Sequence, residues 1–165
     1  MKGRAVERPS PWTLWPGLLL GVLGVGLPGC NEDHPATAAQ ILTSLSVEDA
    51  SGVPETSFSV GQPVTLVFTL TNSASFPVGI ALPSTQTYDF VVVSATQTWQ
   101  WSVGKSFFPN VTTLLFQANE TKTFTVEWDQ VDNSGAPFAP GPCTASAFVP
   151  AATPIPSPSV SFTLL

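Results

Sequence analysis

The sequence predicts an all-β domain over residues 41–165, folded as an antiparallel sandwich of two sheets. Apolar and polar residues alternate along several segments, which is the period of a half-buried strand. Turn-forming residues such as Gly, Pro, Asn and Ser separate these segments at short intervals. No ten-residue stretch carries an apolar stripe of helical period. Short strands separated by such turns are typical of a sandwich.

The alternation is clearest in two segments. Val64–Thr71 places apolar residues on one side and threonine on the other, broken only by Val67, and Thr123–Asp129 alternates in the same way. Tyr88–Val93 is apolar on both sides apart from Asp89, which predicts a strand in the middle of a sheet or one covered on both faces. The other predicted strands are Leu42–Val47, Val78–Leu82, Trp99–Val103, Thr113–Phe116, Cys143–Val149 and Val160–Leu164, for a total of about nine.

The first residues have the layout of an export signal. Lys2, Arg4 and Arg8 form a basic patch, and no charged residue follows until Glu32. The apolar core, Leu18–Leu27, is interrupted by glycines, whereas a membrane-spanning helix needs about 20 steadily apolar residues. The segment therefore predicts a signal peptide.

The end of this segment, Leu27-Pro28-Gly29-Cys30, resembles the lipobox of bacterial lipoproteins. The resemblance implies cleavage after residue 29 and attachment of a lipid such as palmitate to Cys30, which anchors the chain to a membrane. An uncleaved anchor helix is the alternative, and both interpretations place the domain outside the cytoplasm. Residues 30–40 are then the lipidated cysteine and a flexible tether. Asn31, by resemblance to enteric lipoproteins, favours the outer membrane or cell surface.

Charge and residue types argue against several functions. Residues 31–165 carry only Lys105 and Lys122 against ten carboxylates, for a net charge of −8, which repels nucleic acid. The single histidine, His34, lies in the predicted tether, so no base is held beside a nucleophile and we expect no enzyme. We expect no cofactor and no metal. Glu127 and Asp129 share a strand face and could bind calcium, but they are most simply a solvated face.

The second cysteine, Cys143, has no partner in the chain if Cys30 is acylated, which excludes an intramolecular disulfide. Cys143 shares its strand face with Ala145, Ala147 and Val149, which predicts a small buried residue. The alternative is a reactive thiol or an intermolecular bridge.

Residues 64–149 resemble the BsuPI-type proteinase inhibitor domain, an immunoglobulin-like β-sandwich. The motifs that carry the resemblance are Phe68-Thr69-Leu70-Thr71-Asn72, Phe76-Pro77-Val78, Tyr88-Asp89-Phe90-Val91-Val92, Trp99-Gln100-Trp101-Ser102, Lys105, Phe107, Phe108, Asn119-Glu120 and Pro140-Gly141. The resemblance implies an immunoglobulin-like fold and inhibition of a serine proteinase. That family's founding activity is intracellular, whereas this chain is predicted to be exported.

Aromatic residues supply the candidate binding sites. Trp99 and Trp101 share a face and either belong to the core, which we favour, or are exposed and anchor a peptide or stack on a sugar. We expect one of Phe107 and Phe108 to be exposed. A proteinase inhibitor presents a rigid loop, and the candidates are residues 104–110 and residues 132–142. In the second loop, prolines surround Phe138, which predicts an apolar tip.

Together these observations predict a lipid-anchored envelope protein with a non-catalytic, protein-binding sandwich that acts as a proteinase inhibitor. Its partners are the membrane, through Cys30, and a proteinase or other envelope protein. The alternatives are a structural or assembly module of the envelope, pairing through an edge strand or an aromatic patch, and a carbohydrate-binding module that uses Trp99 and Trp101.

Overall fold

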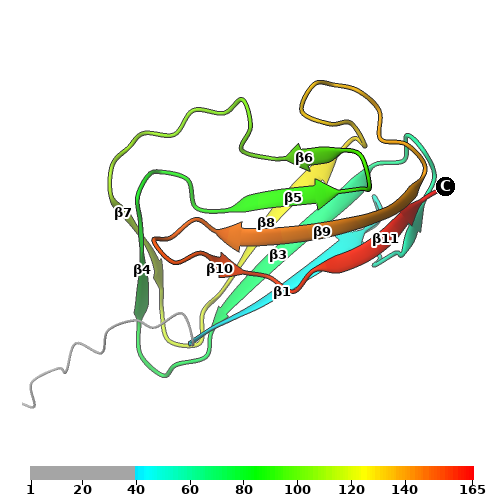
Figure 1. Cartoon of the computed structure of the whole chain (residues 1–165). Helices are drawn as coiled ribbons and strands as arrows, with labels where there is room; N and C mark the ends of the chain where they lie inside the picture. Colours follow the sequence, from blue (N-terminus) through cyan, green and yellow to red (C-terminus); the bar gives the residue numbers. More distant parts are fainter. Residues whose placement is uncertain (1–39) are drawn as a thin grey trace, which may run out of the picture. The chain divides into compact units, whose positions relative to one another are not determined.

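The computed structural model describes residues 40–165, and it contains eleven strands in this part of the chain (Figure 1). The strands are β1 (Ile41–Glu48), β2 (Ser57–Phe58), β3 (Val64–Asn72), β4 (Val78–Leu82), β5 (Asp89–Val93), β6 (Thr98–Gln100), β7 (Thr112–Phe116), β8 (Thr121–Trp128), β9 (Gly141–Val149), β10 (Ile155–Pro156) and β11 (Val160–Leu164). The predicted signal peptide, the lipidated Cys30 and the tether up to residue 39 lie outside the described residues. Residues 40–165 contain no helix that is long and apolar enough to cross a membrane.

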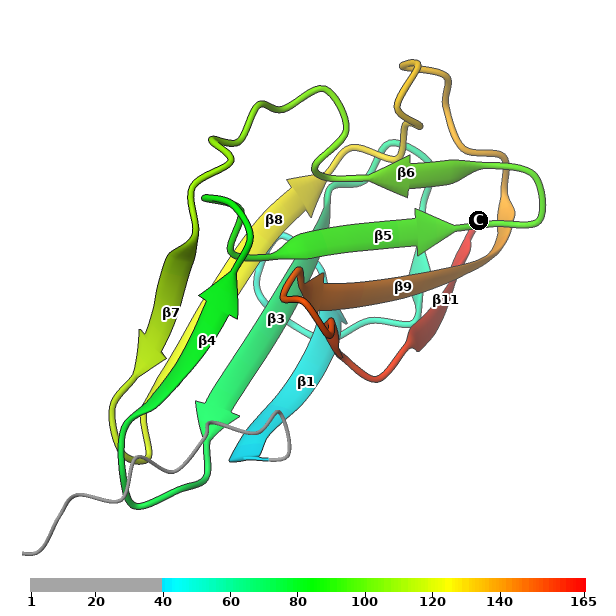
Figure 2. The ribbon, with the colours of Figure 1, turned by 60° about the vertical axis from the view of Figure 1, so that its left-hand side comes forward.

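The strands form two layers. One layer is the sheet β1-β3-β8, and the other is the sheet β2-β11-β9-β5-β6, with β10 added beside β9. Strands β4 and β7 pair separately. All pairs are antiparallel except β2 with β11. Figure 2 shows β3 passing behind β5, at an angle to it.

The predicted immunoglobulin-like, antiparallel β-sandwich is confirmed, with eleven strands rather than about nine. The two that the sequence analysis missed, β2 and β10, have two residues each. So short a strand shows no alternation, and its ladder is set by its neighbour rather than by its own sequence pattern.

Strand β3 shows how alternation builds the core. Every second residue from Val64 to Asn72 is buried, and the threonines between them face outward. The antiparallel register with β8 places Phe68 opposite Phe124 and Val64 opposite Trp128. Apolar side chains from both layers therefore meet in one core, and burial of each large one stabilises the fold by about 1.5–3 kcal/mol.

Two further expectations about strands are confirmed. Strand β5 lies in the interior of its sheet, between β9 and β6, as its apolar residues on both faces predict. Cys143 on β9 is buried and free, with 2% of its surface exposed. Burial raises the pKa of its thiol, which keeps the sulfur protonated.

One predicted strand is shorter than expected. Trp99–Val103 was predicted as a strand, but β6 ends at Gln100 and residues 101–104 form a turn. Gly104 closes this turn with a φ of 80°, a conformation that costs glycine little. The ladder ends here because the N–H of Ser102 donates to the side chain of Asp89 on β5 instead of to a main-chain carbonyl of that strand.

Candidate protein-binding site

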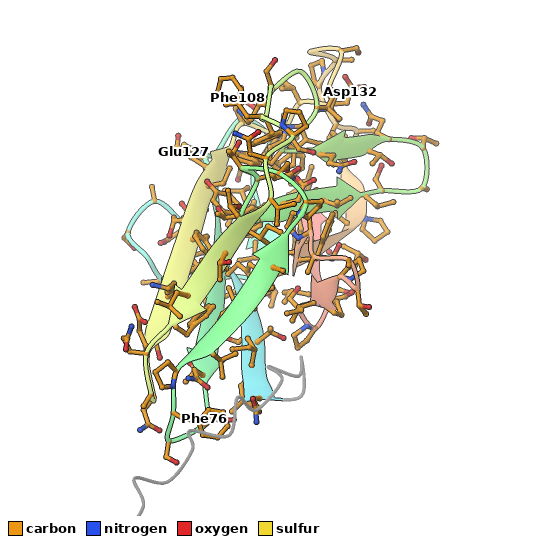
Figure 3. All side chains as sticks on the ribbon, turned by 90° about the vertical axis from the view of Figure 1, so that its left-hand side faces the viewer. Phe76, Phe108, Glu127 and Asp132 are labelled. Carbon is orange, nitrogen blue, oxygen red and sulfur yellow. The ribbon has the colours of Figure 1, made fainter. Side chains whose placement is uncertain are left out.

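Two long connections lie at one end of the sandwich. We call residues 101–111 the β6–β7 loop and residues 129–140 the β8–β9 loop. Figure 3 shows Phe108 of the first loop and Asp132 of the second at one end, with Phe76 at the opposite end. Strand β1 begins at that opposite end, since Ile41 pairs with Asn72, four residues before Phe76.

The β6–β7 loop carries exposed apolar side chains. The exposed fractions are 53% for Val103, 72% for Phe108 and 80% for Val111. Phe108 is the only aromatic residue among the large apolar side chains that are exposed in residues 40–165. Phe107, its neighbour, is half-buried, which confirms the expectation that one of the pair is exposed. An exposed aromatic ring is the kind of group that dominates binding interfaces.

The start of this loop is held by a buried carboxylate. Asp89 is 1% exposed, and its Oδ2 accepts hydrogen bonds from Ser102 Oγ and from Gln100 Nε2, both at 2.6 Å. Its Oδ1 accepts from the N–H of Ser102 at 3.1 Å and from the N–H of Phe90 at 2.9 Å. Four donors from two strands and the turn converge on one side chain. The chain is thereby fixed where β6 ends and the loop begins.

Aromatic packing fixes the next part of the loop. The ring centres of Trp101 and Tyr88 lie 4.4 Å apart, and Tyr88 stacks on Phe124 of β8 with ring centres 4.5 Å apart. Phe107 packs on Trp101 at 6.0 Å, and the Nζ of Lys105 lies 4.8 Å from the centre of the Trp101 ring. These contacts connect the loop to both layers of the sandwich, and the cation–π contact covers part of the indole.

The far part of the loop is tied to the connection between β4 and β5. The N–H of Phe108 donates to Thr85 Oγ1 and the C=O of Phe108 accepts from the N–H of Thr85, both at 3.1 Å. Thr112 Oγ1 then donates to the C=O of Ser84 at 2.8 Å. The exposed ring of Phe108 thus stands on a main chain that is held on both sides.

The β8–β9 loop is pinned to β6 by side-chain amides. Asn133 Oδ1 accepts from the N–H of Gln100 at 2.8 Å, and Asn133 Nδ2 donates to the C=O of Gln100 at 2.9 Å. Gln97 Nε2 donates to the C=O of Pro137, and Gln97 Oε1 accepts from the N–H of Ala139, both at 2.9 Å. Asn133 therefore occupies the hydrogen-bonding edge of β6 at Gln100, which disfavours addition of a partner's strand there.

Asp132 stabilises the turn at the tip of the β8–β9 loop. Its Oδ1 accepts from the hydroxyl and the N–H of Ser134, at 2.6 and 2.8 Å, and from the N–H of Ala136 at 3.0 Å. These hydrogen bonds lower the pKa of Asp132, and the hydrogen bond from the Ser134 hydroxyl has the largest effect. Asp49, Ser51 and Val53 repeat the same arrangement in the turn after β1.

The prediction that Phe138 forms an exposed apolar tip is wrong. Its side chain is 2% exposed and packs edge-on against Trp128, with ring centres 4.8 Å apart. Trp128 is itself fully buried, and its Nε1 donates to the C=O of Val131 at 2.9 Å. The prolines around Phe138 hold the chain against the core instead of extending it, and the tip is the polar turn that Asp132 stabilises.

Trp99 and Trp101 face the inside of the sandwich. Both are half-buried and pack against the core, Trp99 beside Trp128 at 6.0 Å and Trp101 beside Tyr88. This agrees with the preferred interpretation that they belong to the core. They do not form a flat exposed platform, so nothing in their geometry favours stacking of a sugar.

Three residues of this site were missed as site residues in the sequence analysis: Asp89, Asn133 and Thr85. Asp89 did leave a signal, since it is the single charge in an apolar strand, and a buried charge needs donors around it. Asn133 and Thr85 left none, because their partners lie 33 and 23 residues away in sequence.

Carboxylates elsewhere do not gather into a metal site in the part of the chain that the structure describes, where no group of three His, Cys, Asp or Glu side chains converges. Glu127 on β8 and Asp129, the first residue after β8, are both exposed on either side of the buried Trp128, which confirms that they belong to a solvated face. The predicted tether residue His34 lies outside the described residues.

A family model decides the relationship of this chain to known proteins. The model described as "Intracellular proteinase inhibitor", BsuPI, matches residues 53–153, which include Asp89 and both loops. The chain belongs to the BsuPI family. No curated protein matches the chain significantly.

Solved structures resemble this BsuPI chain at low sequence identity. The alkylpurine DNA glycosylase AlkC of Pseudomonas fluorescens, bound to DNA with an abasic site analog, is 16% identical with a TM-score of 0.49, covering 76% of this chain and 30% of that one. The β-glucosidase EmGH1 of Erythrobacter marinus is 12% identical with a TM-score of 0.45, and the match covers 76% of this chain and 15% of that one. The CARDB domain of PF1109 from Pyrococcus furiosus, in complex with di-metal ions, is 12% identical with a TM-score of 0.39, and the match covers 76% of this chain and 89% of that one. This chain therefore spans about a third or less of the first two proteins.

Proposed function

We propose that this BsuPI chain is a non-catalytic proteinase inhibitor that binds its proteinase through the β6–β7 loop. We further propose that a lipid on Cys30 holds it at a bacterial membrane. The observation that carries the proposal is the exposed ring of Phe108, on a loop fixed at its start by Asp89 and further along by Thr85, in a chain of an inhibitor family. A loop that is already ordered loses little conformational entropy on binding.

The position of the loop suits this role. Strand β1 follows the predicted tether and begins at the end opposite Phe108. With the anchor at Cys30, the domain can present the β6–β7 loop away from the membrane. We propose the outer membrane or cell surface as its location, where it meets exported rather than intracellular proteinases.

Inhibition assays test the function. The full chain is titrated against a panel of serine proteinases, with a protein substrate, and we expect inhibition of at least one member. Unchanged rates across the whole panel, at inhibitor concentrations up to about 10 μM, would reject the proposal; that concentration corresponds to a binding free energy of about −7 kcal/mol.

Lipid attachment is tested separately. Cells that express the chain are labelled with radioactive palmitate, and we expect label on the wild-type protein and none on Cys30→Ser. The variant should move from the membrane fraction to the soluble fraction. Equal labelling of both proteins would show that Cys30 is not the site.

A further inference from the structure

The main chain of Phe108 is already used inside the protein. Its N–H donates to Thr85 Oγ1, and its C=O accepts from the N–H of Thr85, both at 3.1 Å. The side chain is 72% exposed. Phe108 therefore presents an aromatic ring to a partner, while its carbonyl points back at the domain.

An inhibitor that binds like a substrate needs the opposite arrangement. A serine proteinase places the carbonyl oxygen of the reacting residue in its oxyanion hole, where donors lie about 2.7–3.1 Å away. An extended substrate also pairs its main chain with the enzyme as an added strand does. Phe108 can do neither while both hydrogen bonds to Thr85 are intact.

The neighbouring contacts make release of this segment costly. The N–H of Trp101 donates to the C=O of Phe90 at 2.9 Å, and Thr112 Oγ1 donates to the C=O of Ser84 at 2.8 Å, so the loop is fixed on each side of Phe108. Pro109 follows directly and has no N–H to offer to a partner. The loop therefore keeps the main chain of Phe108 hydrogen-bonded within the domain and exposes only the ring to a partner.

We infer that the Phe108 ring docks into an apolar pocket of a serine proteinase outside its catalytic centre, and that the β6–β7 loop is not cleaved. This inference rests on the proposed function and adds the mode of binding. The body of the sandwich then obstructs the approach of protein substrates. A small peptide substrate still reaches the catalytic serine.

Phe108→Ala in the full chain tests the docking ring, with subtilisin and chymotrypsin as probes and casein as the protein substrate. We expect the inhibition constant to rise at least about tenfold, as for a central aromatic anchor. Leu42→Ala is the matched control, because Leu42 is 60% exposed and lies on β1, at the opposite end of the sandwich, and it should stay within about twofold of wild type. Both variants should melt as the wild type does, since both side chains are exposed.

Two readouts test the mode of binding. Hydrolysis of a small peptide anilide should continue at an inhibitor concentration that stops casein hydrolysis. Pro109→Ala supplies an ordinary amide after Phe108, so any remaining resistance to cleavage is due to the contacts with Thr85; we expect the variant to inhibit and to stay intact by mass spectrometry.

The outcomes separate the inference from the function on which it rests. If neither proteinase is inhibited by the wild type, the proposed function is rejected for these probes and the inference with it. Inhibition that Phe108→Ala leaves unchanged overturns the inference alone. Cleavage of Pro109→Ala after residue 108, or complete loss of anilide hydrolysis, also overturns it, because either result places Phe108 at the catalytic centre.

Discussion

Replacing Asp89 by alanine should destabilise the domain markedly. The substitution leaves four donors without their acceptor: two main-chain N–H groups and the side chains of Gln100 and Ser102. The two side chains are half-buried and can turn toward water, so they add little. The two N–H groups each cost about 1–3 kcal/mol when left unpaired, and relief from burying a carboxylate offsets part of this. We expect a loss of about 3 kcal/mol.

Urea denaturation measures this change as a lower midpoint with an unchanged slope. In thermal melting, a loss of about 3 kcal/mol in a domain of this size corresponds to a fall in Tm of about 10 °C. Asp89→Asn keeps the volume but turns an N–H₂ group toward the donors, so it should fall between wild type and Asp89→Ala. Asp129→Ala is the control, since Asp129 is exposed, and should change stability by less than about 0.5 kcal/mol. A loss below about 1 kcal/mol for Asp89→Ala would refute the view that Asp89 organises β6 and its loop.

Three further predictions concern other parts of the domain. Cys143 should resist a thiol reagent at pH 8 in the native state and react readily in denaturant, because burial raises its pKa; rapid native reaction would contradict this. Asp132 has a lowered pKa in the folded state, so its stabilising effect is complete above the ordinary value of 3.8 and is lost as pH falls below it. The difference in stability between wild type and Asp132→Ala should therefore shrink in acid, and a constant difference down to pH 2 would disprove the linkage. Gln130→Ala should cost about 2 kcal/mol in urea melts, since its amide makes three hydrogen bonds to main-chain groups of residues 59–62; an unchanged midpoint would reject that estimate.

The layers of the sandwich were predictable because their signal is local. Alternation in β3 sets which side chains are buried, and one buried face is enough to specify the register with β8. The turn before β8 was also predictable: Asn119 adopts a φ of 58°, a conformation that asparagine enters more readily than most residues.

The site was predictable only in part, because its geometry depends on contacts between distant segments. Exposure of one ring in the Phe107-Phe108 pair followed from adjacency, but which of the two is exposed depends on Trp101 and Thr85. Phe138 was misplaced because a loop rich in proline suggests an exposed tip, whereas the space beside Trp128 decides where the ring lies. That space is created by residues far away in sequence.

The contact between Asn133 and Gln100 bears on how this protein avoids self-association. An uncovered strand edge is a template on which identical chains can stack into aggregates. Here one carboxamide binds the N–H and the C=O of Gln100 as a neighbouring strand would, so a single side chain ends the ladder where another domain would need a whole strand or a bulge. Solubility at this edge then depends on one residue in a loop.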